Sequence, residues 1–347
     1  MAVSRREFIK AGFAAVGAAL GGFGLARDLF AGGIPERESG QGLPAPADGL
    51  PRYIGLERSG ELARREQALW ALYDPCRLCP RLCGANRSAG RAGICSAASS
   101  LRVASFGPDF GNERAIAGTR GSGSIFVSNC NLLCVFCQNW QIAHRGDGTR
   151  TSHQELANML LNMQRRGCHN VSFITPTHMV PHLISGLRLA IAGGLNVPLC
   201  YNTSGYDSLE VIQLLDGIVD IYQPDFKFQS AEHSARFASA PDYPVHAAAA
   251  IKEMVRQVGF LQVGQDGLAR RGVVVRHLLM PENIAGTDVF VRWVVSELGS
   301  DAHVNIMNQY WPAHRAIDFP PIDRRITPEE AAQAMRWARE AGLRHFH

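Results

Sequence analysis

The sequence of 347 residues predicts an α/β fold built on a mostly parallel sheet. From residue 125 onward, short apolar runs of strand character alternate with segments of helical periodicity, and polar residues gather directly after the apolar runs. Such alternation is typical of parallel strands joined by right-handed helical crossovers. Hydrophobic residues make up 46% of the chain, an ordinary value for a protein that buries a core.

The individual elements follow from the period and the length of each apolar pattern. We expect strands at residues 125–127, 170–174, 197–201, 218–222, 273–279 and 304–307. We expect helices at residues 61–73, 156–166, 183–192, 209–215, 245–258, 289–298 and 328–341.

Charge and cysteine spacing narrow the class of protein. The net charge of +4 comes from 35 basic and 31 acidic residues without a dense basic stripe, so nucleic acid is not indicated as a partner. Seven of the nine cysteines fall in two tight groups, which suits metal or cluster ligation better than a spread disulfide framework. Cys168 and Cys200 stand alone beside apolar residues, and we expect both to be buried thiols.

The first cysteine group belongs to a cysteine-rich N-terminal module that we place at residues 61–115. Glycines between its members allow the backbone to turn the sulfurs inward around a metal. Zinc and an iron–sulfur cluster both fit four thiolates, and disulfide pairing is the alternative. The group consists of Cys76, Cys79, Cys83 and Cys95.

The second cysteine group has a C-x3-C-x2-C spacing and follows the expected strand at 125–127. Its members are Cys130, Cys134 and Cys137. Three thiolates cannot saturate a [4Fe–4S] cluster, so one iron keeps an open position at which a small molecule can bind. The alternative is a zinc knuckle or a redox cluster with a fourth ligand elsewhere.

Polar residues follow the other expected strands. In a parallel sheet, the carboxyl ends of the strands meet at one edge, so these residues should lie near the second cysteine group. Each of them alone could equally be a satisfied structural group. The stretches concerned are Thr175-Pro-Thr-His178, Asn202-Thr-Ser-Gly205, Asp225-Phe-Lys227, Arg276-His277 and Asn308-Gln-Tyr310.

The second cysteine group, with Phe136 before its last cysteine, strongly resembles the radical S-adenosylmethionine (SAM) superfamily. Residues 76–310 resemble more closely the pyruvate formate-lyase activating enzyme-like branch, among its uncharacterised activase homologues. The resemblance implies a partial (β/α)6 TIM-like barrel, which we place at residues 116–347. It also implies a [4Fe–4S] cluster whose open iron binds S-adenosyl-L-methionine.

The same resemblance implies an activity. A low-potential electron donor would reduce the cluster, SAM would be cleaved, and the resulting radical would abstract hydrogen from an unknown substrate, with a glycyl-radical enzyme as a candidate protein partner. The alternative is an exported iron–sulfur electron-transfer or metal-binding protein without radical activity.

One departure from the activase pattern concerns the cofactor pocket. Where activases carry a Gly-Gly-Glu stretch for the methionine amino group, this chain has Thr175, Thr177 and His178 as candidate acceptors. The resemblance assigns Lys227 to the cofactor carboxylate, with Asp225 holding Lys227 or a donor near the ribose. The remaining cofactor-binding candidates are Asn202 and Arg276, of which Arg276 could instead meet a substrate acid or belong to an inter-strand ion pair. No catalytic residue is assigned.

The N-terminus has the pattern of a targeting segment. Ser4-Arg5-Arg6-Glu7-Phe8-Ile9-Lys10 resembles a twin-arginine signal, and the uncharged apolar stretch 11–26 suits a signal h-region. We expect a signal or anchor at 1–31 and a linker at 32–60. The resemblance implies cytoplasmic folding and cluster loading, then export to a periplasmic or membrane-anchored state, with membrane contact only through this segment. A chance basic N-terminus before a buried helix is the alternative.

Overall fold

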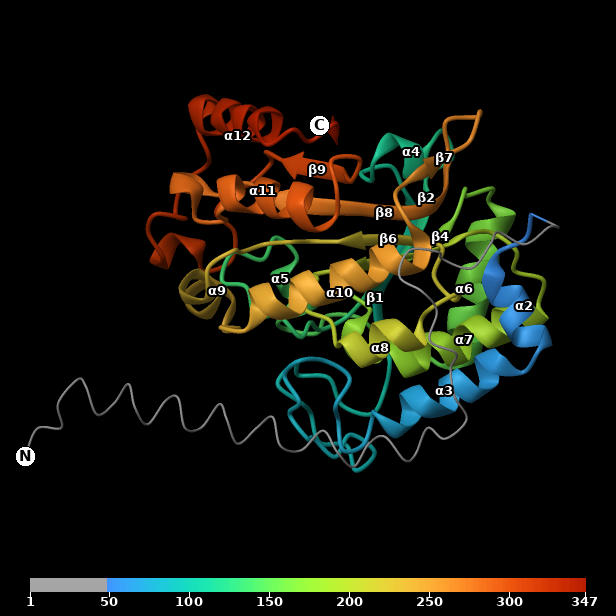
Figure 1. Ribbon diagram of the computed structural model, residues 1–347. Helices are drawn as coiled ribbons and strands as arrows, with labels where there is room; N and C mark the ends of the chain where they lie inside the picture. Colours follow the sequence, from blue (N-terminus) through green and yellow to red (C-terminus); the bar gives the residue numbers. More distant parts are fainter. Residues whose placement is uncertain (1–48) are drawn as a thin grey trace, which may run out of the picture. The chain divides into compact units, whose positions relative to one another are not determined.

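A ten-stranded sheet forms the centre of the protein (Figure 1). The computed structural model describes residues 49–347, which lie within one compact unit. Hydrogen-bonded neighbours run in the order β10-β9-β8-β6-β5-β4-β2-β1-β3, and β7 pairs with β8. The predicted α/β class with a partial barrel is confirmed.

The strands are β1 Arg102–Asp109, β2 Ser122–Val127, β3 Thr149–Arg150, β4 Val171–Ile174, β5 Leu199–Thr203, β6 Ile221–Pro224, β7 Gln262–Val263, β8 Ala269–Leu278, β9 His303–Met307 and β10 His345–Phe346. The α-helices are α2 Arg52–Arg58, α3 Glu61–Ala71, α4 Arg114–Ala117, α5 Trp140–Ala143, α6 His153–Arg165, α7 Val180–Ala192, α8 Leu209–Leu214, α9 Ala231–Ala238, α10 Tyr243–Val258, α11 Thr287–Glu297 and α12 Pro328–Glu340. Short 3-10 turns are η2 Thr177–Met179, η3 Pro281–Asn283 and η4 Ala316–Asp318.

The six expected strands are β2, β4, β5, β6, β8 and β9, and each is parallel to its neighbour among them. Ile125 lies opposite Phe173, Phe173 opposite Tyr201, and Tyr201 opposite Tyr222. This register stacks buried apolar and aromatic side chains across the sheet. It also brings the carboxyl ends of the strands to one edge, where the cysteine loop after β2 lies.

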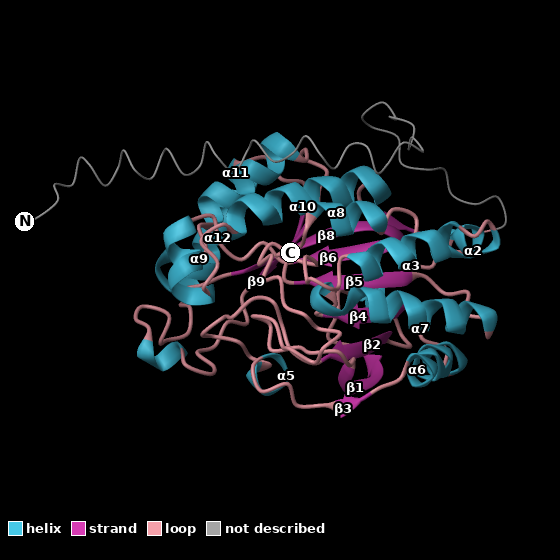
Figure 2. Ribbon diagram, turned by 90° about the horizontal axis from the view of Figure 1, so that it is seen from below, coloured by secondary structure: helices cyan, strands magenta, loops and turns pink. Residues whose placement is uncertain are grey.

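The crossover helices α6, α7, α8 and α10 lie along the outside of the sheet (Figure 2). Their apolar stripes face inward; in α6, Leu156, Leu160 and Met163 are buried. A capping box fixes where this helix begins, because the Ser152 side chain and the Glu155 side chain each accept a backbone N–H of the other residue.

Two elements that the sequence patterns did not predict lie before residue 116. Strand β1 pairs antiparallel with β2, so the boundary predicted between the cysteine-rich module and the barrel falls between two paired strands. Helix α2 lies within the linker expected at 32–60, so that prediction is wrong for residues 52–58. Tyr53 of this helix is fully buried, and its hydroxyl donates to the Val197 carbonyl at 2.8 Å.

The predicted twin-arginine segment at 1–31 lies outside the described residues, as does the predicted linker up to residue 48. Among residues 49–347, no helix combines the length and the apolar character needed to cross a membrane.

Candidate functional site

The second cysteine group lies on the loop that leaves the carboxyl end of β2. Asn129 begins the turn with a φ of 73°, and its N–H donates to the Ile142 carbonyl at 2.9 Å. Cys130 and Cys134 are buried and Cys137 is partly buried, all three as free thiols. The Leu132 N–H donates to the Cys130 sulfur at 3.4 Å, which orders the loop around that sulfur.

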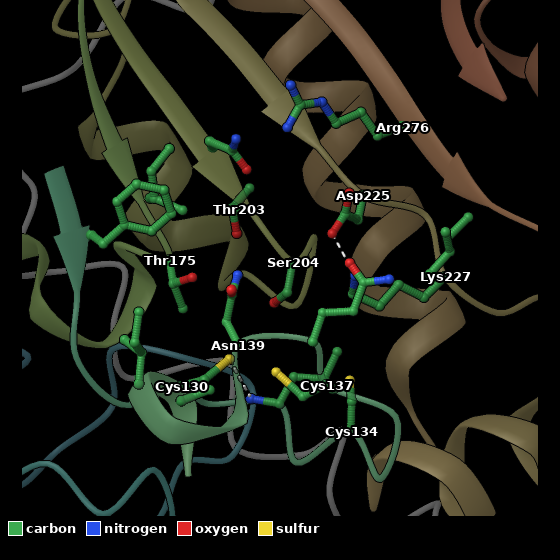
Figure 3. A pocket seen from close by; sticks show the side chains of 18 of the residues that line it. Cys130, Cys134, Cys137, Asn139, Thr175, Thr203, Ser204, Asp225, Lys227 and Arg276 are labelled. Atoms are coloured by element: carbon green, nitrogen blue, oxygen red, sulfur yellow. Dashed lines mark hydrogen bonds and ion pairs between the residues drawn. The ribbon is translucent and has the colours of Figure 1, made fainter. Parts of the chain in front are cut away.

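A cavity of about 400 Å³ opens beside these cysteines. Figure 3 shows the three cysteines at one end and Arg276 at the other, with Thr175, Thr203 and Ser204 between them. All five parallel strands from β2 to β8 contribute lining residues at or just beyond their carboxyl ends. The cavity therefore occupies the place where parallel α/β folds hold ligands.

Asp225 and Lys227 form an ion pair in the cavity wall, beyond the end of β6 (Figure 3). Burial acts to lower the pKa of Lys227, but the opposing attraction of Asp225 is greater, so the pKa is raised. Lys227 is thus held as a cation beside the cysteine loop. Such a cation stabilises negative charge on the sulfurs or on a bound carboxylate.

Arg276 at the far end of the cavity is paired with Glu113, which lies before α4. The two guanidinium–carboxylate bonds measure 2.8 and 2.6 Å, and the side chains are 12% and 4% exposed. Burial acts to raise the pKa of Glu113, but Arg276 and Asn305 outweigh it and lower the pKa to about 2. One alternative for Arg276 was an inter-strand ion pair. Arg276 does form a buried ion pair, but its partner Glu113 lies before α4 in the N-terminal module and not in a strand.

The other predicted cofactor residues separate into two sets. Thr175 and Asn202 line the cavity, and the Thr175 N–H donates to the Asn202 carbonyl at 2.9 Å. Thr177 and His178 do not line it. The Thr177 hydroxyl donates to the buried Asp207 carboxylate at 2.7 Å, and the His178 ring contacts the Ser128 carbonyl at 2.8 Å. Burial lowers the pKa of His178 to about 4, so this imidazole is neutral.

Some cavity residues lie outside the stretches that the sequence patterns marked. Ser204, which lies in the marked stretch 202–205, lines the cavity with a buried hydroxyl that has no hydrogen-bond partner among the described residues. Six side-chain amides line the cavity. Asn202 was predicted because it follows the expected strand at 197–201, whereas Asn139 directly follows the cysteine group and could have been found from that position. The six are Asn112, Asn129, Gln138, Asn139, Asn202 and Gln309.

Comparison with known proteins identifies the family. Residues 124–285 match the model of the radical SAM superfamily. The chain is also 31% identical, over 281 residues, to an uncharacterised protein of Methanocaldococcus jannaschii; the match covers 78% of this chain and 76% of the relative. This chain belongs to the radical SAM superfamily. Members of the superfamily use a [4Fe–4S] cluster and S-adenosyl-L-methionine, and the chain is an enzyme of this kind.

Two solved structures are similar to this chain. The [FeFe]-hydrogenase maturase HydG shares 13% identity at a TM-score of 0.44, over 67% of this chain and 52% of its own. Methylornithine synthase PylB shares 12% identity at a TM-score of 0.40, over 88% of this chain and 82% of its own. The chain spans about half the length of the HydG chain that it matches.

The cavity residues of this radical SAM enzyme fit the two cofactors. Cys130, Cys134 and Cys137 would hold three irons and leave the fourth open. Burial raises the pKa of Cys130 to about 12, so in the apo protein this sulfur keeps its proton, and cluster binding must release it. Lys227 supplies a buried positive charge beside the resulting anionic site. When bound, the cluster supplies the electron that cleaves SAM reductively.

The segments that carry the two cysteine groups are in contact. Arg81, between Cys79 and Cys83, donates through Nε to the Asn131 carbonyl at 3.0 Å, and Asn131 directly follows Cys130. Cys168 and Cys200 are buried free thiols away from both groups, as predicted.

Proposed function

We propose that this enzyme abstracts a hydrogen atom from the peptide backbone of a partner protein, at a glycine. The amide-rich cavity wall carries the proposal. A side-chain amide offers one acceptor and two donors, the same groups that a peptide bond requires from its partner. Asn139 makes no side-chain hydrogen bond within residues 49–347, so its amide can turn toward an extended backbone. Glycine is the residue whose missing side chain admits its α-carbon closest to the cofactor.

The cofactor would sit between the cysteine loop and this wall. Lys227 would meet the methionine carboxylate, and Asp225 would fix the Lys227 ammonium. The Thr175 and Ser204 hydroxyls and the Asn202 amide would accept or donate hydrogen bonds to the amino group and the ribose. Arg276 is held by Glu113, so we assign it to shaping the substrate end of the cavity instead of to the methionine carboxylate.

Isotope transfer tests the proposed substrate class. Reconstituted enzyme, SAM and a strong one-electron reductant would be mixed with peptides that carry α,α-dideuterated glycine at a central position. The proposal predicts deuterium in the 5′-deoxyadenosine product, detected by mass spectrometry. Matched peptides with α-deuterated alanine at that position should transfer much less.

The proposal is contradicted if 5′-deoxyadenosine forms in abundance but never carries deuterium from any glycine peptide. Peptides taken from a glycyl-radical enzyme encoded near this chain are the first to test, because a neighbouring gene of that class is what the activase-like branch predicts.

We also propose that the twin-arginine-like segment exports the protein after the cluster is loaded in the cytoplasm. Support comes from the Ser4-Arg5-Arg6-Glu7-Phe8-Ile9-Lys10 pattern alone. Conservative substitution of both arginines (Arg5→Lys with Arg6→Lys) should retain the protein in the cytoplasmic fraction of cells. Equal distribution of wild type and variant between fractions would contradict export by this route.

A further inference from the structure

The first cysteine group forms a compact site of its own, separate from the cavity. Cys76, Cys79 and Cys95 are buried and Cys83 is partly buried, and none is in a disulfide. Backbone bonds hold the segments together: Cys76 N–H donates to the Ala85 carbonyl and Gly84 N–H to the Cys76 carbonyl, each at 3.0 Å. Disulfide pairing, one alternative from the sequence, is therefore not what the structure has.

Gly93 packs against two of these sulfurs. A Cβ at this position would lie 3.0 Å from the Cys83 sulfur and 3.7 Å from the Cys95 sulfur. Gly93 therefore approaches both thiols more closely than a residue with a side chain could without displacing Cys83. Turns after Cys79 and Cys95 place Leu82 and Ser96 at positive φ, of 41° and 61°, which bends the backbone around the same point.

A buried cation without a carboxylate partner lies against this group. Arg87 is fully buried, and its Nη1 lies 3.9 Å from the Cys76 sulfur. Its other partners are neutral: the carbonyls of Ala98 and His178, the Met179 sulfur and the face of the Tyr73 ring. No carboxylate among residues 49–347 forms an ion pair with it. A buried, uncompensated charge is costly, so its position indicates an anion at the four sulfurs.

Zinc held by four thiolates would carry a net negative charge as well, so the spacing of the sulfurs must separate it from a cluster. Among the residues the structure describes, no group of three or more His, Cys, Asp or Glu side chains is placed to hold a metal ion. The same is true of Cys130, Cys134 and Cys137, in a superfamily that uses a [4Fe–4S] cluster. A four-iron cluster binds each thiolate through a different iron, so its ligands stand farther apart than those around one zinc.

We propose that Cys76, Cys79, Cys83 and Cys95 bind a second [4Fe–4S] cluster, closed by four thiolates and neutralised in part by Arg87. With every iron ligated by protein, this cluster has no open position for SAM. Cys83 borders a surface hollow of about 430 Å³, which gives iron and sulfide a route to the site. The contact of Arg81 with Asn131 places the second cluster next to the catalytic cysteine loop.

Anaerobic iron and sulfide analysis of the reconstituted full chain tests this proposal. Wild type should hold about eight irons and eight sulfides per chain. The double variant Cys76→Ala with Cys79→Ala should hold about four, and so should the double variant Cys130→Ala with Cys134→Ala. Cys168→Ala removes a buried thiol outside both groups and should keep about eight. Wild type with about four irons, or a first group that retains zinc in place of iron, would overturn the proposal.

A spectroscopic measurement on wild type tests for the second cluster even if a double variant fails to fold. Mössbauer spectra should resolve two clusters, of which SAM perturbs one and leaves the other unchanged. One cluster, or two that both respond to SAM, would contradict a closed second site. This outcome is independent of the proposed substrate, because 5′-deoxyadenosine formation and deuterium transfer are measured separately.

Two further variants probe the site without removing a ligand. Gly93→Ala should reduce the iron bound by the first group, whereas Gly55→Ala, where a Cβ meets nothing within 4 Å, should not. Arg87→Met removes the buried positive charge and should shift the reduction potential of the second cluster to lower values while leaving that of the SAM-responsive cluster in place. An unchanged potential in Arg87→Met would contradict the charge-compensating role of Arg87.

Discussion

Replacing Glu113 with glutamine removes the negative half of the ion pair at the far end of the cavity. The change keeps the size of the side chain but removes the carboxylate that bonds the guanidinium directly, so Arg276 keeps the Asn112 amide oxygen at 2.9 Å and the more distant charges of Asp225 and Asp109. We expect a marked loss of folding stability, because a buried guanidinium then lacks its directly bonded carboxylate.

The size of the loss follows from the pKa of Glu113. Folding lowers this pKa from 4.5 to about 2, and each tenfold change in an acid dissociation constant corresponds to about 1.4 kcal/mol, so the ionised carboxylate stabilises the fold by roughly 3 kcal/mol. Because the folded pKa is depressed, this contribution is complete above about pH 4.5 and is lost as the pH falls toward 2. Direct removal of one partner of a buried pair costs a similar amount, about 3–5 kcal/mol.

Urea unfolding of the reconstituted protein at pH 7 under anaerobic conditions measures this loss. Glu297→Gln is the matched control, because Glu297 pairs with Lys252 at the surface, where the side chains are 41% and 46% exposed. The control should lose less than about 1 kcal/mol. If Glu113→Gln is no more destabilised than Glu297→Gln, the buried pair does not stabilise the far end of the cavity.

Three other predictions concern single residues. Lys227→Met should keep its cluster iron but bind SAM at least about tenfold more weakly in isothermal titration, while exposed Lys252→Met binds normally; equal affinities would remove Lys227 from the cofactor pocket. Thr177→Val should lower the free energy of unfolding by about 1–3 kcal/mol, since it takes a hydrogen bond from buried Asp207, without weakening SAM binding; weakened SAM binding in a stable variant would return Thr177 to the cofactor site. Burial lowers the pKa of His277 to about 4, so protons bind the unfolded chain preferentially and stability falls as the pH drops through 6.5 toward 4. The free energy of unfolding of wild type, measured in urea, should therefore fall by about 2 kcal/mol between pH 7 and pH 5. If the free energy of unfolding of a His277→Gln variant falls equally over this range, the prediction is refuted.

The strand pattern and the cysteine loop could be predicted because their signals are local. Apolar runs such as 125–127 and 170–174 mark buried parallel strands, and the C-x3-C-x2-C spacing marks the loop that lies beside the cavity. Residues directly after strands were found by the same argument, as Thr175, Asn202, Asp225 and Lys227 all line the cavity.

The missed features depend on contacts between distant parts of the chain. Glu113 pairs with Arg276, which lies 163 residues later in the sequence, and no local pattern around Asn112-Glu113-Arg114 predicts that contact. Strand β1 contains Gly107 and Pro108, which weaken a strand pattern, and forms because β2 offers an antiparallel edge. Thr177 and His178 follow β4 as closely as Thr175 does, but the positive φ of Thr175 turns the chain, and the 3-10 turn then directs both side chains away from the cavity.

Reductive cleavage of SAM by the reconstituted protein is the decisive assay for the catalytic cluster. With a strong one-electron reductant, wild type should form 5′-deoxyadenosine and methionine, and SAM should change the electron paramagnetic resonance signal of the reduced cluster. Cys130→Ala should abolish both responses, while Cys168→Ala should retain them. A fully loaded wild-type cluster whose signal ignores SAM and which yields no 5′-deoxyadenosine would contradict the assignment of Cys130, Cys134 and Cys137 to a catalytic radical SAM site.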